Sequence, residues 1–399
     1  MKYSLGKWLA ISSIALLAFN MRTAVSSLSP IISFIQVDIA LPIVTIGLLG
    51  IAAPLSFALA TSLSYRPARR WGVEKTLMLT IVIIIFGHLL RAFAWDSTSL
   101  FAGSLLSLLG MGIGNVLMPV MVRKYFPNRV GLVSTLYITL TALSATLGSF
   151  AAVPLAEAFG WRVSLGQWAL FSLLAAVPLL TLLKNSAPEK REQAEAGQLS
   201  IWRSPTAWAI AGMQAMTAVY GYVAFAWLPI LLIEYNRVSV AEGGLLLSLF
   251  AIMGLPASLV VPILASRYKS AQVWIVVFSG TMGVIGSLGL LLSSNTWLWL
   301  FVIFVGLGPT MFPLALTMFN LRSKKRATVL AVSAFGQGLS YSTAAAAVFS
   351  VGVLRELTGG WEAAIWLLFG FALLALPVAL QIAKHKTIDE ELRPKKKAL

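Results

Sequence analysis

Apolar runs of about 20 residues recur from one end of this chain to the other, and they decide what it can fold into. A helix of that length crosses the hydrocarbon core of a bilayer, which is about 30 Å thick. Only 11% of the 399 residues are charged, whereas a soluble domain carries roughly 25%. The sequence therefore predicts an all-α integral membrane protein that is surrounded by lipid and has no nucleic-acid partner, despite its net charge of +16.

The apolar runs predict twelve transmembrane helices in two halves of six. A polar segment of mixed charge, residues 185–204, separates the halves and is typical of a linker. We expect an N-terminal six-helix bundle over 1–184, a C-terminal bundle over 205–384 and a tail over 385–399. Two six-helix halves related by a parallel repeat are the arrangement of the major facilitator fold. The predicted helices are 8–35, 42–64, 76–95, 98–122, 131–154, 163–184, 205–234, 239–265, 271–293, 296–319, 327–352 and 361–383.

The lysines and arginines indicate which way the helices cross. If both termini are cytoplasmic, 25 of the 30 basic residues fall in cytoplasmic segments and four in the outer loops. Cytoplasmic loops are the ones that carry an excess of Lys and Arg. The apolar run at the N-terminus is too long for a signal peptide, so we expect it to be retained as the first helix.

The remaining basic residue, Arg22, lies within the first predicted helix. It is about 21 Å from the start of that helix at 1.5 Å per residue, near the middle of the bilayer. A central arginine costs ~2.5–3.5 kcal/mol on insertion scales, and no acidic residue is predicted deep in a neighbouring helix. Either Arg22 is a structural residue bonded to main-chain carbonyls and water, or it faces a central cavity and binds an anionic or electron-rich substrate. We favour the second interpretation, because the planar guanidinium suits small planar or anionic groups.

Polar residues at helical spacing indicate further cavity-facing positions. Arg22, Ser26, Ser29 and Ser33 form one stripe on the first helix, which should face helices or water. Asn115 is a candidate either for helix packing or for the cavity, as are the glutamines and tyrosines of the later helices. The predicted substrate-binding residues are Arg22, Asn115, Tyr137, Gln214, Tyr220, Gln337 and Tyr341.

Two titratable residues near the outer end of the third helix, His88 and Arg91, are one turn apart. His88 is a candidate for proton coupling, with a structural histidine as the alternative. We expect Arg91 to extend its charged group to the membrane surface.

A membrane enzyme is disfavoured, because it would need paired carboxylates, a histidine cluster or a Ser–His arrangement. The chain has two histidines, His88 and His385, and no cysteine. It therefore has no Cys-based metal or redox site and no disulfide. We expect no metal and no cofactor.

Several motifs in order resemble the cyanate and nitroimidazole transporter family of the major facilitator superfamily. They are "NMR" in the first helix, "GNVLMPVMVRKYFPNRVGLVSTLY", "GWRVSLGQWAL", "YGYVAFAWLPILL" and "FGQGLSYSTAA". The family's first-helix motif is Asn-Leu-Arg-Pro; Asn20, Met21 and Arg22 resemble it, and Thr23 replaces the proline.

This resemblance implies a secondary transporter of small anionic or planar polar solutes in a bacterial cytoplasmic membrane, working by alternating access. We expect a monomer in contact with lipid. The alternative is a multidrug or metabolite exporter of the same fold, and a non-transporting sensor is a third interpretation. Three interpretations of the driving force remain. The solute carries the proton itself, His88 takes part in proton transfer, or the solute moves down its own gradient without a coupled proton.

Overall fold

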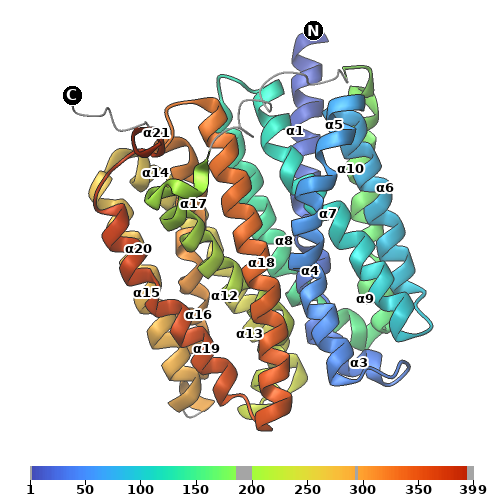
Figure 1. Ribbon diagram of the computed structural model, residues 1–399. Coiled ribbons are helices and arrows are strands. Elements are labelled where there is room, and N and C mark those ends of the chain that lie inside the picture. The colour runs from blue at the N-terminus through green and yellow to red at the C-terminus, as the bar shows by residue number, and fades with distance from the viewer. Residues whose placement is uncertain (1, 186–199, 293–294, 393–399) are drawn as a thin grey trace.

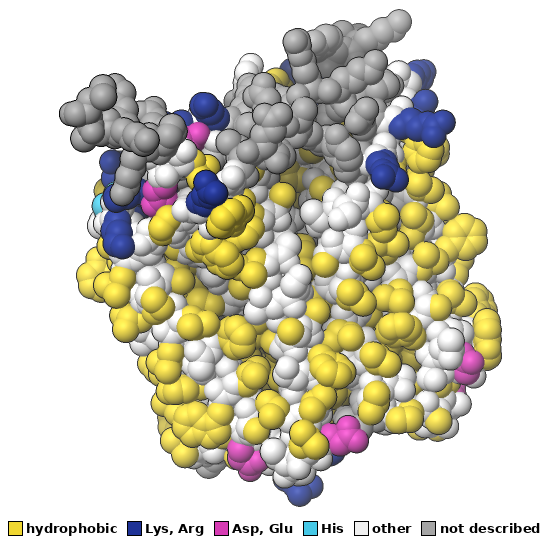
Figure 2. All heavy atoms as spheres, in the orientation of Figure 1, with side chains coloured by type: hydrophobic (Ala, Val, Ile, Leu, Met, Phe, Trp, Pro, Cys, Tyr) yellow, Lys and Arg dark blue, Asp and Glu magenta, His cyan; other side chains and the backbone are white. Residues whose placement is uncertain are grey.

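The computed structural model describes residues 2–185, 200–292 and 295–392, and these ranges contain helices and no strand. Figure 1 shows the helices of the first half of the chain packed on one side of the molecule and those of the second half on the other. Both termini lie at the same end of the bundle. Lys and Arg side chains gather at this end in Figure 2, and we call it the basic face. The predicted linker falls mostly on 186–199, outside the described residues.

The N-terminal bundle contains ten helices and two short 3₁₀ turns. They are α1 (Lys2–Asn20), α2 (Thr23–Ser26), η1 (Ser29–Ile31), α3 (Ile32–Gln36), α4 (Ile43–Leu63), α5 (Tyr65–Trp71), α6 (Val73–Ala92), α7 (Ser97–Tyr125), α8 (Val130–Phe159), α9 (Trp161–Gly166), α10 (Trp168–Leu182) and η2 (Leu183–Asn185). Gly72 joins α5 to α6 with a φ of 88°, in the left-handed region that favours glycine.

The C-terminal bundle follows the same plan. Its elements are η3 (Ile201–Arg203), α12 (Pro205–Tyr235), α13 (Val240–Ile252), α14 (Gly254–Arg267), α15 (Lys269–Leu292), η4 (Asn295–Trp297), α16 (Leu298–Leu307), η5 (Gly308–Thr310), α17 (Met311–Leu321), α18 (Arg326–Thr358), α19 (Glu362–Leu373), α20 (Ala375–Ile382) and α21 (Ile388–Glu391). Several predicted helices are therefore two shorter helices in series, such as α13 with α14 and α19 with α20.

Eleven spans within the described residues are long and apolar enough to cross a membrane. The predicted helix over 327–352 corresponds to α18, which is 33 residues long but is not among the eleven. Its sequence carries glutamine, serine, threonine and tyrosine near the middle, and these residues lower its mean hydropathy. Exposed apolar side chains cover the flanks of the bundle in Figure 2, as lipid contact requires.

The two bundles meet closely in the half of the molecule away from the basic face. A Cβ on Gly50 of α4 would lie 2.9 Å from both Ala226 of α12 and Val348 of α18, so glycine is needed for this approach. In the same half, Ser248 of α13 donates a hydrogen bond of 2.9 Å to Ser149 of α8. These contacts join the bundles on the side opposite the basic face.

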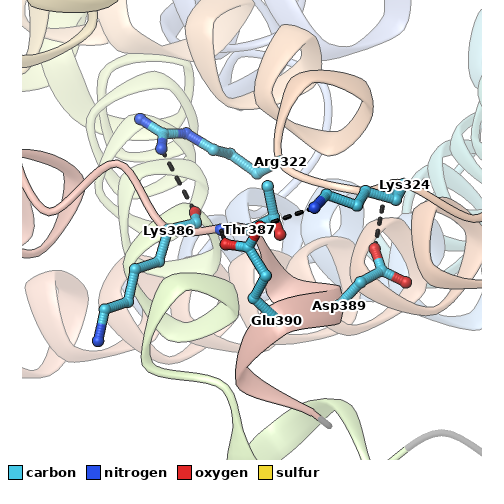
Figure 3. A network of polar contacts seen from close by, with 6 residues as sticks. All are labelled: Arg322, Lys324, Lys386, Thr387, Asp389 and Glu390. Carbon is cyan, nitrogen blue, oxygen red and sulfur yellow. Dashed lines mark hydrogen bonds and ion pairs between the residues drawn. The ribbon is translucent and has the colours of Figure 1, made fainter.

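The acidic helix α21 closes the basic face of the C-terminal bundle. Its Glu391 accepts hydrogen bonds from the main chain and the hydroxyl of Thr206, 3.0 and 2.8 Å long, and so caps the start of α12. Asp389 accepts bonds from Lys324 N and Thr328 at the start of α18, while Lys324 Nζ pairs with Glu390 at 2.7 Å. Figure 3 shows part of this network. Residues 385–392 were expected in a tail; they instead fold onto the bundle.

The Glu390 contact makes a small part of the stability depend on pH. Hydrogen bonds from Lys324 and Thr387 lower the pKa of Glu390 from 4.5 to about 2. Because the folded pKa lies below the unfolded one, the contribution is complete above pH 4.5 and is lost as the pH falls towards 2. We expect Glu390→Gln to melt slightly lower than wild type at pH 7. Scanning calorimetry should find the difference shrinking in acid; a constant difference across this range would contradict the assignment.

Candidate functional site

The first transmembrane segment is broken where the sequence predicted one helix over 8–35. Helix α1 ends at Asn20 and α2 starts at Thr23, with Arg22 between them at φ −130°, ψ −5°. The Asn20 amide nitrogen donates to Leu16 O at 2.7 Å, and its oxygen accepts a bond from Ser172 of α10. The hydroxyl of Thr23 donates to Asn20 O at 3.2 Å, so a side chain satisfies a main-chain carbonyl freed by the break.

Arg22 lines a central cavity of about 220 Å³ between the two bundles. The cavity reaches Pro119, in the last third of α7, and Leu316, in the last third of the span Leu298–Leu321, so it extends towards the basic face. Arg22 is the sole charged side chain among the described residues that line it. Pockets for drug-sized ligands are larger, roughly 300–1,000 Å³. The cavity is therefore small, mostly apolar and positively charged at one point.

The guanidinium of Arg22 is held from the other bundle. Its Nη1 donates a hydrogen bond of 2.8 Å to the hydroxyl of Tyr222 on α12. Its central carbon lies 5.4 Å from the ring centre of Phe57 and 5.5 Å from that of Tyr222, within cation–π range. Within the described part of the chain, no partner bonds the other guanidinium nitrogens, and no acidic side chain lies in the cavity. These N–H groups are donors that a solute in the cavity can use.

Three aromatic rings surround this arginine. Phe57 of α4 packs edge-on against Tyr222 at 6.0 Å and against Tyr341 at 5.6 Å, while the two tyrosines are 6.2 Å apart. Phe57 is on α4, whereas Tyr222 is on α12 and Tyr341 is on α18, so these ring contacts cross between the bundles. The aromatic cluster therefore connects the halves of the protein around the arginine.

Five of the six other predicted substrate-binding residues line the central cavity. Asn115, Tyr137, Gln214, Gln337 and Tyr341 line the same cavity as Arg22, from four different helices. The side-chain oxygen of Gln214 is buried with no hydrogen-bond partner in the described structure. The amide of Gln337 donates to Ser333 at 3.0 Å. A binding role for these residues stays a prediction.

Tyr220, which was also predicted to bind the substrate, packs inside the C-terminal bundle in this structure. Its hydroxyl donates to Leu368 O at 2.9 Å and lies 3.2 Å from Ser287 Oγ. It does not line the cavity. The tyrosine that the sequence analysis missed is Tyr222, which lies on the opposite side of α12.

A signal for Tyr222 exists in the sequence. The residues of α12 that line the cavity are Gln214, Thr217, Ala218, Gly221, Tyr222 and Phe225. Their spacing of i, i+3, i+4, i+7, i+8 and i+11 is one helical stripe. The stripe that begins at Gln214 includes Tyr222 and excludes Tyr220.

In the predicted polar stripe on the first segment, Ser26 and Ser29 are buried against other helices as expected, whereas Ser33 is not. Ser33 is exposed, and the Ser26 hydroxyl donates back to Arg22 O at 3.1 Å. Ser26 faces α8, since a Cβ on Gly148 would lie 2.2 Å from its Oγ. A break in the helix changes its phase, so a spacing calculated for one continuous helix no longer holds.

His88 lies apart from the cavity. It is fully buried in α6 and does not line the cavity, and both ring nitrogens lack hydrogen-bond partners in the described structure. Arg91 does not reach the surface as expected; it is also fully buried, with all three guanidinium nitrogens unpartnered in the same ranges. Participation of His88 in proton coupling stays a prediction, and it would require a route through the N-terminal bundle.

The described residues contain no group of three His, Asp or Glu side chains that could hold a metal ion.

The sequence model of the Major Facilitator Superfamily matches residues 14–345 of this chain. The chain belongs to the major facilitator superfamily. It is 33% identical to the uncharacterized transporter YycB of Bacillus subtilis over 94% of this chain and 92% of that one. It is 30% identical to the 2-nitroimidazole transporter of Escherichia coli over 93% of each chain. The cyanate transport protein CynX of Escherichia coli is 26% identical over 87% of this chain and 90% of its own length.

Solved structures agree on the fold. A crystal structure of the nucleoside transporter NupG covers 94% of this chain with a TM-score of 0.73, and 99% of its own chain is covered. A crystal structure of a D-xylose–proton symporter covers 96% of this chain, with 98% of its own chain covered and a TM-score of 0.71. Both are 12% identical to this chain, so they show the major facilitator fold alone. The protein is a multi-pass membrane transporter of the major facilitator superfamily.

Proposed function

We propose that this transporter carries a small anionic or planar, electron-rich solute, and that Arg22 binds it in the central cavity. The proposal depends on one observation: among the described residues, one edge of the Arg22 guanidinium has no partner and the cavity lining has no acidic side chain. A cation in a low-dielectric cavity attracts anions and repels cations. The names of the relatives, a 2-nitroimidazole transporter and a cyanate transport protein, support this class of solute.

The size of the cavity supports the same class. A cavity of about 220 Å³ suits a small ion or a single heteroaromatic ring better than a large drug. A solute oxygen or nitrogen would accept bonds from the free guanidinium edge, while Asn115, Gln214 and Gln337 offer amides around it. This argues against a multidrug exporter.

The positions of the cavity and of the bundle contacts support an inward-facing state. The cavity extends towards the basic face, which we place in the cytoplasm on the positive-inside rule. The bundles are in close contact on the other side, at Gly50 and at the Ser149–Ser248 bond. Alternating access would open that side and close the basic face around Arg22. Because the described cavity lining holds no acid and no histidine, we propose that any coupled proton travels on the solute.

A thermal-shift screen of the purified protein tests the proposed solute class. A ligand that binds the folded form stabilises it by mass action, by about 2.7 kcal/mol at 100 times its Kd. We expect sodium cyanate or 2-nitroimidazole to raise the melting temperature, and xylose, a neutral sugar, to leave it unchanged. Stabilisation by xylose with no response to either of the other two would show that the solute class is wrong.

A further inference from the structure

A second, smaller cavity lies beyond the aromatic cluster, on the side away from the basic face. It measures about 30 Å³ and is lined mainly by apolar residues of α2, α4 and α7 and by Leu28, which lies between α2 and η1. This volume holds one or two water-sized guests. Two residues of α12, Tyr222 and Phe225, line both this cavity and the central one. The two cavities are therefore neighbours with these two side chains between them.

The second cavity contains a polar group that the fold does not use. Ser29 lines it and is buried, with 5% of the residue exposed. Its hydroxyl has no hydrogen-bond partner within the described residues. The other serine of the cavity, Ser104, donates to Leu100 O at 2.8 Å within its own helix. An unpartnered hydroxyl in an apolar cavity is costly, and it offers a donor to a small guest.

Tyr222 and Phe225 are held in place by aromatic packing and by one hydrogen bond, and an anion can replace that hydrogen bond. The Tyr222 hydroxyl accepts the 2.8 Å bond from Arg22, and its ring packs edge-on against Phe57. Phe225 packs edge-on against Phe250 of α13 at 5.8 Å. A solute that takes over Arg22 Nη1 removes the one hydrogen bond that the structure gives the Tyr222 hydroxyl. The ring is then retained by aromatic packing alone, worth ~0.5–1.5 kcal/mol per pair.

We propose that Tyr222 and Phe225 form a gate in the transport path, and that the second cavity is the next subsite for the solute beyond Arg22. The Ser29 hydroxyl is the donor that receives an anionic or electron-rich solute there. A solute that moves from the free guanidinium edge onto Nη1 releases Tyr222, and separation of the bundles at Gly50 then widens the subsite towards the opposite face. This inference rests on the proposed solute path through the central cavity.

Cysteine labelling tests the gate directly, because the chain contains no cysteine. Ser29→Cys is labelled with a membrane-impermeant thiol reagent, which is added to each face separately in intact cells and in inverted membrane vesicles. When the reagent is added at the basic face, we expect the Ser29→Cys single variant to be labelled slowly. In a protein that carries both Ser29→Cys and Tyr222→Ala, labelling of the cysteine from that face should be at least tenfold faster. Tyr222→Phe, which keeps the ring and removes the hydroxyl, should give an intermediate rate.

Matched controls separate opening of the gate from loosening of the whole protein. Gln337→Cys, in the central cavity, should label from the basic face in every background. Ser107→Cys is fully buried on α7 and lines neither cavity, so it should stay unreactive with Tyr222→Ala. If the Tyr222→Ala protein does not fold, Phe225→Ala removes the other half of the partition and should also accelerate labelling.

An unchanged labelling rate of Ser29→Cys in a folded Tyr222→Ala or Phe225→Ala protein would overturn the gate. The readout needs no solute, so it is independent of the proposed function. If cyanate and 2-nitroimidazole fail to bind while Tyr222→Ala still exposes Ser29→Cys, the solute class is wrong and the gate remains. If both ligands bind in the cavity while labelling never changes, the gate is wrong and the proposed function remains.

Discussion

Replacing Arg22 with alanine is expected to weaken binding of the solute by about 100-fold while the protein still folds. Hydrogen bonds to a charged group contribute about 1.5–3 kcal/mol, which corresponds to ~10–150-fold in Kd. The charge has no acidic partner among the described residues, so its removal leaves no buried carboxylate unpaired. Arg22→Lys keeps the charge but loses the planar fork, so it should lose about tenfold. Titration calorimetry with cyanate or 2-nitroimidazole measures each Kd.

The control for this prediction is an arginine outside the cavity. Arg162 pairs with Asp38 and donates to Ala94 O on the opposite face. Arg162→Ala should bind the solute as wild type does. We expect wild type and Arg162→Ala to bind most tightly, Arg22→Lys to bind less tightly and Arg22→Ala to bind most weakly. Wild-type affinity in a folded Arg22→Ala protein would remove Arg22 from the binding site.

Gly87→Ala is expected to destabilise the N-terminal bundle by about 3 kcal/mol or more, the upper end for an overpacked interior. A Cβ at this position of α6 would lie 2.3 Å from the main-chain nitrogen of Ser107 on α7 and 2.7 Å from its Cα. Main-chain atoms cannot rotate away, so the two helices must separate. Small residues that permit close helix approach are a main source of packing energy in membranes.

Gly370→Ala is the matched control, because no atom lies within 4 Å of a Cβ built at this position in α19. It should be neutral or stabilise the protein by up to ~1 kcal/mol. Thermal unfolding in detergent compares the two variants. Equal melting temperatures would mean that α6 and α7 are not in such close contact.

The architecture could be predicted because it depends on features that are visible in the sequence of a single helix. Spans such as 205–234 are predominantly apolar, and the structure places α12 at Pro205–Tyr235. Arg22 was identified because a charge in hydrocarbon has few explanations, and the structure places it at the central cavity. Both inferences need only composition and position along one helix.

The positions that sequence reasoning missed depend on contacts between distant segments. The break at Arg22 involves Asn20 and Ser172, which are 152 positions apart, and neither proline nor glycine marks it. Phe57 is an ordinary apolar residue of α4 until its contacts with two tyrosines are known. Arg91 was expected at the surface because it is close to a helix end, yet α7 covers it, with Gly103 against its main chain.

Counterflow in proteoliposomes tests most directly whether transport of the solute across the membrane requires Arg22 in the central cavity. Vesicles loaded with unlabelled cyanate or 2-nitroimidazole are placed in a trace of the same labelled solute. We predict transient accumulation of label with wild type and Arg162→Ala, and none above protein-free vesicles with Arg22→Ala. Equal accumulation with wild type and Arg22→Ala would contradict the account.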